Sequence, residues 1–249
     1  MIELFPAPAS LPQGRRIYAI GDIHGCARQL ADLHAAIAAD VNDRPVASAL
    51  LLHIGDYVDR GADTAGVIER LVKGCPIPGM DMVNLMGNHE STMLEALTGE
   101  RAAGTDWLFA GGKAALQSYG IDPEGPRDVW ATRIPQSHQD FLRNLVLMHR
   151  EGGYAFIHAG VRPGIPLEDQ ARDDLLRSRQ PFLYSEADFG AVVVHGHTPV
   201  KTPVVRQNRI AIDTGAVFGG KLTAVVLEAD TVGFLTADPL DPPVSIAHR

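Results

Sequence analysis

The protein has 249 residues, of which 45% are apolar, 21% are charged and 6% are aromatic. This apolar content suffices for the core of one large or two small domains, and it excludes an intrinsically disordered chain. No stretch approaches the ~18 consecutive apolar residues that a helix needs to cross a bilayer. The net charge of −8 disfavours general binding to nucleic acid or anionic lipid, so any attraction for a phosphorylated substrate has to be local.

The two cysteines, Cys26 and Cys75, are too few for a disulfide framework or a four-thiolate metal site. Residues 1–14 hold three prolines and no basic segment ahead of an apolar block, so they do not resemble a secretory signal. We therefore expect a cytoplasmic protein. We also expect a single domain over 1–249, with an irregular arm at 1–14 and a tail at 238–249.

In the first hundred residues, short apolar runs alternate with helical patterns. The predicted strands cover 16–21, 48–54 and 82–86, and the predicted helices cover 29–39, a stretch beginning at Asp63 or Thr64, and 91–97. This alternation predicts an α/β fold with parallel strands. Residues 98–150 are polar and punctuated by glycine, and we expect them to form an inserted helical cap over a site.

Strands return in the second half of the chain. Two are predicted at 154–157 and 191–194, and four more follow closely at 203–205, 209–212, 222–227 and 231–235. The close spacing of the last four predicts an antiparallel meander. Together the elements predict two mixed sheets with flanking helices.

Polar side chains stand where five of these strands end. The five blocks are Gly21-Asp22-Ile23-His24-Gly25, Gly55-Asp56-Tyr57-Val58-Asp59-Arg60-Gly61, Gly87-Asn88-His89-Glu90, His158-Ala159-Gly160 and His195-Gly196-His197-Thr198. Because the carboxyl ends of strands in open α/β sheets face one crevice, these side chains are expected to meet. Packing of the core does not require potential metal ligands at five strand ends, so the joint pattern indicates a functional site.

Carboxylate, imidazole and amide ligands suit Mn, Fe or Zn better than calcium. Six candidate ligands exceed what one such ion needs beside its water, so the pattern predicts two ions. Asp56 follows the central strand of the first three and is the natural bridge between them. Two divalent ions would keep enough positive charge to hold a phosphate dianion and to acidify a bound water.

The five blocks, in this order, resemble the calcineurin-like metallophosphoesterases, and within them the phosphoprotein phosphatase family that includes bacterial serine/threonine phosphatases. The resemblance runs from about residue 16 to 228. It implies the calcineurin-like metallophosphatase fold, in which two mixed β-sheets are sandwiched between helices in four layers (αββα).

The resemblance also implies a role for each site residue. The metal ligands it implies are Asp22, His24 and Asp56 for the first ion, and Asp56, Asn88, His158 and His197 for the second. It implies that His89 protonates the leaving alkoxide while Asp59 orients the ring, and that Arg60 binds the phosphate. Asn88 and Arg179 are further substrate-binding candidates, with Arg177 or Arg162 as alternatives to Arg179. The chain departs from the wider superfamily at Pro199, where many members have a further histidine ligand.

The sequence therefore predicts a manganese-dependent phosphomonoesterase, with Fe or Zn as alternative metals. The implied mechanism is direct attack on phosphorus by a hydroxide held between the ions. We expect a monomer that acts on phosphorylated protein or a small phosphoester, as a serine/threonine phosphatase. The alternatives are a symmetric dinucleoside tetraphosphate hydrolase, which Glu90 and the Asp59-Arg60 pair disfavour, and a non-catalytic metal-binding module.

Single histidines outside these blocks are expected to be structural. They are His34, His53, His138, His149 and His248. His195 neighbours His197, but alternation along a strand would point its side chain away from the site, so it is left out of the ligand set.

Overall fold

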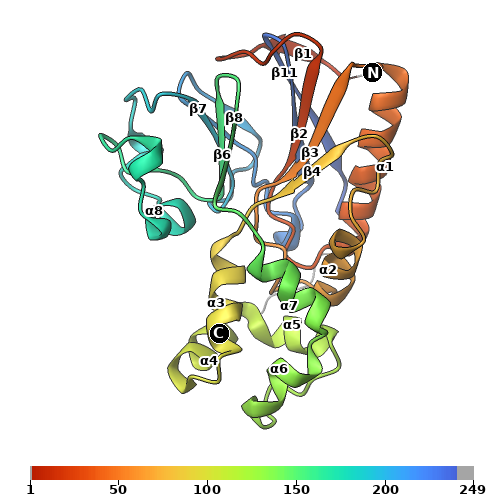
Figure 1. Ribbon diagram of the computed structural model, residues 1–249, viewed down its shortest axis with the longest axis vertical. Helices are drawn as coiled ribbons and strands as arrows, with labels where there is room; N and C mark the ends of the chain where they lie inside the picture. The colour runs from red at the N-terminus through yellow and green to blue at the C-terminus, as the bar shows by residue number, and fades with distance from the viewer. Residues whose placement is uncertain (1, 240–249) are drawn as a thin grey trace.

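The computed structural model describes residues 2–239. Its strands form a six-stranded sheet of order β1-β11-β10-β2-β3-β4 and a five-stranded sheet of order β5-β6-β7-β9-β8 (Figure 1). The first sheet consists of β1 (Leu4–Pro6), β2 (Arg15–Ile20), β3 (Ser48–His53), β4 (Asp81–Asn84), β10 (Leu222–Glu228) and β11 (Thr231–Ala237). The second consists of β5 (Met148–Glu151), β6 (Tyr154–Ile157), β7 (Val192–His195), β8 (Val204–Val205) and β9 (Arg209–Ala211).

Each sheet has a parallel centre and antiparallel edges. In the first sheet β2, β3 and β4 pair in parallel, while β10 runs antiparallel to β2 and to β11. In the second, β6, β7 and β9 pair in parallel, and β5 and β8 are antiparallel edge strands. The prediction of two mixed sheets is confirmed.

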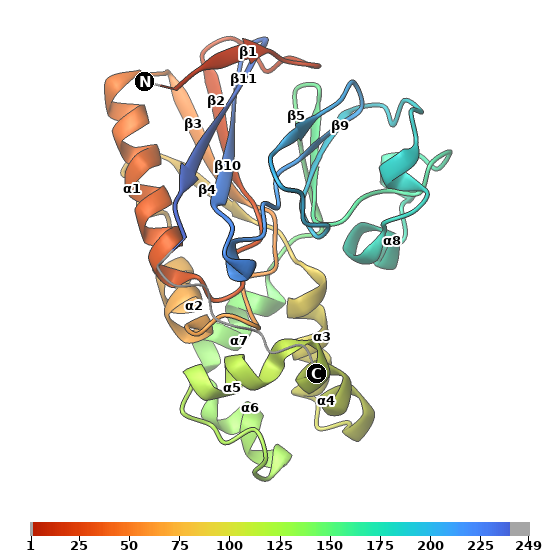
Figure 2. The ribbon, with the colours of Figure 1, turned by 180° about the vertical axis from the view of Figure 1, so that it is seen from behind.

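Helices cover the outer faces of the sheets and the carboxyl ends of the parallel strands. They are α1 (Ala27–Asp43), α2 (Thr64–Val72), α3 (Asn88–Ala96), α4 (Arg101–Trp107), α5 (Lys113–Ser118), α6 (Trp130–Arg133), α7 (Gln136–Arg143) and α8 (Arg172–Arg177), with a kinked segment at Leu108–Gly112 between α4 and α5. The segment from α3 to α7 lies beyond the ends of the strands, on the side away from β1 (Figures 1 and 2). Among residues 2–239, none of the helices has the length and apolar character of a membrane span.

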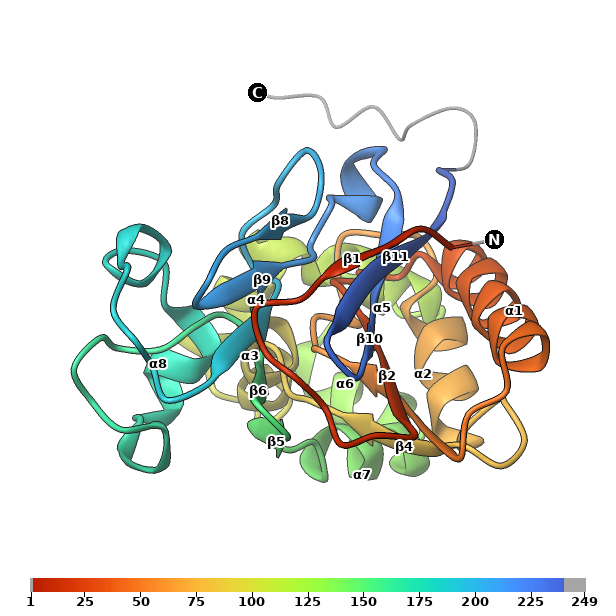
Figure 3. The same cartoon turned by 90° about the horizontal axis from the view of Figure 1, so that it is seen from above.

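Alternation of side chains along the strands builds three cores. In β2, Ile17 and Ala19 face the second sheet and pack with Phe156 and Val194, while Tyr18 and Ile20 face α1 and α2. A third cluster, which includes Phe182 and Phe189, covers the outer face of the second sheet on the side of α8. Figure 3, viewed along the strands, shows α1, the two sheets and α8 in that order. The expected four-layer αββα arrangement is confirmed.

The boundaries of the early helices extend beyond the predicted ones. Helix α1 has four more residues than predicted at its C-terminal end, and its buried side chains include Leu30, Leu33 and Ile37 at the predicted offsets. Helix α2 begins at Thr64, and the Asp63 side chain caps it by accepting a hydrogen bond from Gly66 N–H.

Two expectations about strands differ from the structure. The four late strands do not form one meander, because β8 and β9 form a hairpin in the second sheet whereas β10 and β11 form another in the first. Short spacing predicts hairpins correctly but cannot show that the chain changes sheets between β9 and β10. Within residues 1–14, expected to be irregular, Leu4–Pro6 pair with β11 as an edge strand, a position that tolerates proline. Most of the expected tail, and His248, lie outside the described residues.

A buried arginine ties α1 to the first sheet at the end remote from the strand-end blocks. Arg16 is 2% exposed, and its guanidinium donates two hydrogen bonds to Glu228 of β10, at 2.9 and 3.0 Å. It also donates to the Tyr18 hydroxyl, which donates in turn to Asp40 of α1 at 2.6 Å. Burial alone would raise the pKa of Glu228, but Arg16 and Arg44 hold it below its ordinary value.

We predict that Glu228→Ala lowers the free energy of unfolding by about 2 kcal/mol, less than the ~3–5 kcal/mol of a fully buried pair, because Glu228 is partly hydrated. Chemical denaturation at pH 7 measures this loss of stability. Glu124→Ala is the control, because the Lys113–Glu124 pair is exposed and contributes at most about 1 kcal/mol. A depressed carboxylate pKa stabilises the fold above the unfolded value and ceases to do so in acid. The difference between wild type and Glu228→Ala should therefore shrink below about pH 4. Equal effects of the two variants would contradict the role of this network.

Candidate metal centre

The carboxyl ends of the parallel strands of both sheets meet in one place. Asp22 follows β2, Asp56 follows β3, and Asn88 begins α3 after β4. His158 follows β6 and His197 follows β7 in the second sheet. The Asp56 carbonyl accepts hydrogen bonds from the N–H groups of Ile23 and His24, and Gly196 N–H donates to the His158 carbonyl, so neighbouring loops are fixed to one another.

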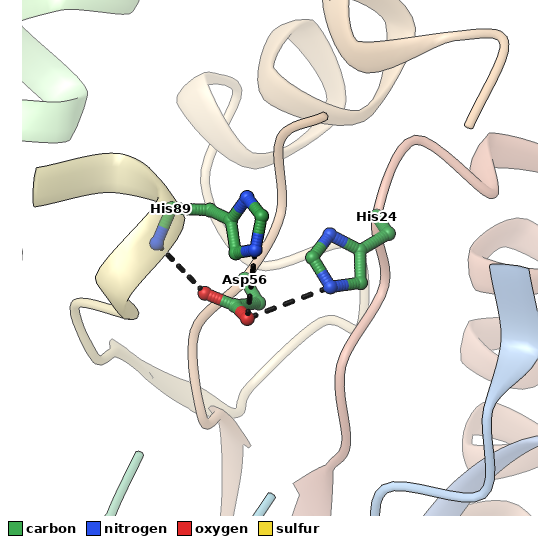
Figure 4. Close-up of side chains that lie close together, drawn as sticks. All are labelled: His24, Asp56 and His89. Atoms are coloured by element: carbon green, nitrogen blue, oxygen red, sulfur yellow. Dashed lines mark hydrogen bonds and ion pairs between the residues drawn. The ribbon is translucent and has the colours of Figure 1, made fainter. Parts of the chain in front are cut away.

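Asp56 lies at the centre of two groups of possible metal-ligating side chains. One group is His24, Asp56 and His89, and the other is Asp56, His158 and His197, with the ligand atoms of each group within 4.8 Å of one another. Asp56 Oδ2 is 3.5 Å from His24 Nε2 and 4.0 Å from His89 Nε2, as Figure 4 shows, while Oδ1 is 3.4 Å from His158 Nε2. Its two oxygens thus face different groups, as the sequence predicts for a bridging residue.

Backbone carbonyls fix the orientation of two histidines. His24 Nδ1 is 2.8 Å from the Val58 carbonyl, and His158 Nδ1 is 3.0 Å from the Ile54 carbonyl. Because a carbonyl only accepts, Nδ1 carries a proton in both rings. A metal-ligating histidine likewise donates from its second nitrogen to a neighbouring oxygen. In the neutral His24 ring, Nε2 therefore presents a lone pair, which accepts a hydrogen bond from Arg60. Burial alone would lower the pKa of His158, but Asp56 raises it above its ordinary value, so His158 Nε2 also carries a proton toward the Asp56 and Asn88 oxygens.

The charge balance of the site also fits cations. Burial and the neighbouring Asp213 and Asp56 carboxylates raise the pKa of Asp22 well above its ordinary value. Burial lowers the pKa of His24 to about 3 and, together with His158, lowers that of His197 to about 3, so both imidazoles are neutral. Crowded carboxylates beside neutral imidazoles form a donor set that divalent cations would stabilise.

Asn88 and Asp22 are attached to the second group by hydrogen bonds. The Asn88 side-chain oxygen is 3.1 Å from His158 Nε2, and His197 N–H donates to both Asp22 oxygens, at 3.2 and 3.0 Å. The structure therefore brings together all six side chains expected as metal ligands, although their occupation by metal stays a prediction.

Left-handed backbone is concentrated here. Among the described residues, six non-glycine residues have positive φ, and five of them are His24 (43°), Asp56 (51°), Asp59 (73°), Arg60 (66°) and His197 (62°). Such conformations are strained for residues with a Cβ atom, and they cluster where function requires the side chain. Two glycines allow close approach, because a Cβ at Gly87 or at Gly196 would overlap the carboxylate of Asp56 or Asp22.

The sequence analysis did not predict that two further carboxylates, those of Glu90 and Asp213, would be buried at the site. Glu90 is fully buried and accepts hydrogen bonds from the backbone N–H groups of Asp56, Tyr57, Val58 and Gly87. The Gly-Asn-His-Glu block itself could have indicated this role, because a glutamate at the third helical position accepts a hydrogen bond from the N–H of the residue that precedes the helix, here Gly87. Asp213 follows β9 and is 4% exposed. Its place at the end of a predicted strand could have identified it from the sequence.

The proposed acid pair of the sequence analysis is formed in the structure. His89 Nδ1 is 2.7 Å from Asp59 Oδ2, and both side chains are buried. Burial alone would lower the pKa of His89, but the Asp56 and Asp59 carboxylates raise it above its ordinary value. His89 Nε2 is turned toward Asp56 within the group that also contains His24 (Figure 4).

Arg60 and Arg179 each contact one of the candidate ligands. Arg60 Nη1 donates to His24 Nε2 at 3.0 Å, and its guanidinium lies 5.5 Å from the Phe218 ring centroid. Arg179 Nε donates to His197 Nε2 at 3.2 Å. The two alternatives point elsewhere, since Arg177 contacts Thr92 and Asp173, and Arg162 pairs with Asp174.

The histidines excluded from the ligand set have other partners. His195 is buried, its Nδ1 contacts the Gly196 carbonyl, and its ring packs against Phe182, away from both side-chain groups. His34 contacts His53, and His138 lies between Tyr119 and Glu69.

Comparison with known proteins agrees with this geometry. The sequence profile of the calcineurin-like phosphoesterases matches residues 15–230. The chain belongs to that family. It is thus a phosphoester hydrolase by family, and the family and the two side-chain groups together indicate a dinuclear site for divalent ions.

Individual relatives carry different activities in their names. Serine/threonine-protein phosphatase 1 of Salmonella typhimurium is 28% identical over 84% of this chain and 90% of its own. An asymmetrical bis(5'-nucleosyl)-tetraphosphatase, PrpE of Anoxybacillus flavithermus, is 27% identical over 83% of this chain and 88% of its own. A serine/threonine phosphatase from Saccharomyces cerevisiae shares the fold, with a TM-score of 0.57 and 14% identity over 92% of this chain and 82% of that one.

We predict that wild-type protein binds two Mn²⁺ per chain and that Asp56→Asn weakens both sites by more than about 100-fold, beyond the ~10–100-fold cost of losing an outer partner of a ligand. His197→Ala should weaken only one site, because its imidazole belongs to one group. Titration monitored by the electron paramagnetic resonance of free Mn²⁺ counts the sites. Unaltered binding of two ions by Asp56→Asn would show that this carboxylate does not bridge them.

Proposed function

We propose that this protein is a metal-dependent phosphomonoesterase that hydrolyses phosphoserine and phosphothreonine in proteins. The observation that carries the proposal is the pairing of His89 with a buried carboxylate directly beside the shared Asp56, with two arginines facing the same place. A metal-binding module without catalysis has no need of this pair.

Our proposed ligands are Asp22, His24 and Asp56 for one ion, and Asp56, Asn88, His158 and His197 for the other. When bound, two divalent ions supply positive charge for the phosphoryl oxygens and acidify the attacking water. The mixed oxygen and nitrogen donors support manganese, iron or zinc, and we propose manganese.

In this proposal His89 acts as the general acid. The Asp59 carboxylate accepts a hydrogen bond from His89 Nδ1–H, which holds the ring with Nε2 directed into the site. There Nε2 donates its proton to the departing alkoxide. The neighbouring Asp56 and Asp59 carboxylates raise the pKa of His89 above its ordinary value and so favour the protonated ring that a general acid needs.

Arg60 and Arg179 are proposed to bind the phosphoryl group. A guanidinium fork matches two phosphoryl oxygens, and these side chains approach the two side-chain groups from different loops. Asn88, whose side chain lies beside His158, is proposed to contact the phosphoryl group as well as its ion.

We predict that Asp59→Asn and His89→Asn lower kcat on a phosphoserine peptide by about 10²–10⁴-fold, the range for loss of a general acid. The loss on p-nitrophenyl phosphate should be at least 10-fold smaller, since nitrophenolate leaves without a proton. Steady-state kinetics of the manganese-loaded proteins compares the two substrates. Equal losses on both would rule out the acid role.

Arg179→Ala is expected to raise KM for the phosphoserine peptide by about 10-fold or more, because a charge-assisted bidentate contact is worth at least 1.5 kcal/mol. Arg177→Ala is the matched control, since it removes a neighbouring arginine that contacts Thr92 instead. A larger effect of Arg177→Ala would reassign the second phosphate-binding arginine.

A dinucleoside tetraphosphate hydrolase is the second candidate. The name of the PrpE relative favours it, and so does Phe218, which is half exposed beside Arg60 and offers a ring on which a nucleobase could stack. A comparison of kcat/KM for the phosphopeptide and for diadenosine tetraphosphate decides between the two. A preference for the dinucleotide would overturn our choice of substrate while leaving the metal centre intact.

A further inference from the structure

Both oxygens of the Asp59 carboxylate are occupied. Oδ2 faces His89 Nδ1 at 2.7 Å, and Oδ1 accepts a hydrogen bond from the indole N–H of Trp107 at 2.8 Å. Asp59 and Trp107 are completely buried. Since water does not reach this carboxylate, the indole is the group that holds its second oxygen.

The chain kinks directly after Trp107. Helix α4 ends at Trp107 and α5 begins at Lys113, and Gly111 between them has a positive φ of 121°, which is not helical. Glycine adopts such an angle readily, so the chain turns at this point.

The same turn is fitted closely to the site on two sides. The Gly111 carbonyl accepts a hydrogen bond from Arg60 N–H at 3.1 Å, and a Cβ at Gly111 would lie 2.7 Å from Arg60 Cγ. A Cβ at Gly112 would lie 2.6 Å from the Trp107 ring. The turn therefore fixes Trp107 against the loop that carries both Asp59 and Arg60.

We propose that Trp107 is a positioning residue for the His89–Asp59 pair, and that its indole N–H fixes the plane of the Asp59 carboxylate so that His89 Nε2 is aimed at the leaving oxygen. This inference rests on the proposed function of the site. An aspartate side chain has a broad, roughly two-fold preference about its last torsion. One hydrogen bond leaves that torsion partly free, whereas two opposed hydrogen bonds fix it.

The chain contains its own control. It has two tryptophans, and Trp130 packs edge to face on Trp107 with ring centroids 5.5 Å apart. Trp130 is equally buried, but its Nε1 has no hydrogen-bond partner among the described residues. Replacement by phenylalanine thus removes similar packing at both positions and removes the hydrogen bond to Asp59 only at Trp107.

The kinetic test compares Trp107→Phe with Trp130→Phe in the manganese-loaded protein. Trp107→Phe should lower kcat on the phosphoserine peptide by about 10–100-fold, a part of the effect of losing the acid, with KM within about twofold. The loss of kcat on p-nitrophenyl phosphate should be at least fivefold smaller. In the double variant, Trp107→Phe should cause no further loss of kcat beyond that of Asp59→Asn alone. Equal losses on the two substrates, or the same pattern in Trp130→Phe, would overturn the proposal.

A second measurement uses metal-free protein and does not depend on activity. With two tryptophans, the indole region of a ¹H–¹⁵N spectrum holds two signals, assigned by the two phenylalanine variants. Asp59→Ala should shift the Trp107 signal and speed its hydrogen exchange more than 10-fold, while that of Trp130 is unchanged. An unaffected Trp107 signal would show that the hydrogen bond does not form.

The outcomes separate this inference from the proposed function. If His89→Asn and Asp59→Asn fail to discriminate between leaving groups, the acid role itself is wrong. If they discriminate and Trp107→Phe does not, the acid role stands and the positioning role of Trp107 is wrong.

Discussion

The site depends on one residue that joins every strand end around it. The Asp56 carbonyl holds the loop after β2, its N–H is held by Glu90, and its carboxylate accepts from His89 N–H while facing the imidazoles of both sheets. A carboxylate buried this deeply needs compensating partners, and the neighbouring histidines hold its pKa well below the ordinary value although burial alone would raise it. The loops at the ends of both sheets therefore converge on the Asp56 carboxylate.

Much of this could be predicted from the sequence because it is local. The apolar runs of β2, β3 and β7, the spacing of α1 and the capping of α2 by Asp63 are all set by near neighbours. The polar residues at strand ends follow from one rule about parallel sheets. Because these residues do assemble in the structure, the polar residues at several strand ends predict a site better when they are considered together than one at a time.

Other features depend on contacts between distant parts of the chain. The change of sheet between β9 and β10 depends on which edge is free to pair, and Glu90 gains its partners only when the loop after β3 folds over α3. Trp107 lies 48 residues from Asp59 along the chain, so no local pattern in the sequence indicates their hydrogen bond. Arg179 could be singled out among three arginines only by where its loop directs it.

The left-handed backbone at His24, Asp56 and His197 has a consequence for how this chain could be changed. Glycine adopts such angles without steric strain, so a glycine at one of these positions would relieve strain in the backbone. Each such replacement would remove an atom that the chemistry needs. Engineering for durability would therefore have to spare these positions deliberately and seek its improvements elsewhere, at loops and surfaces remote from the meeting point of the sheets.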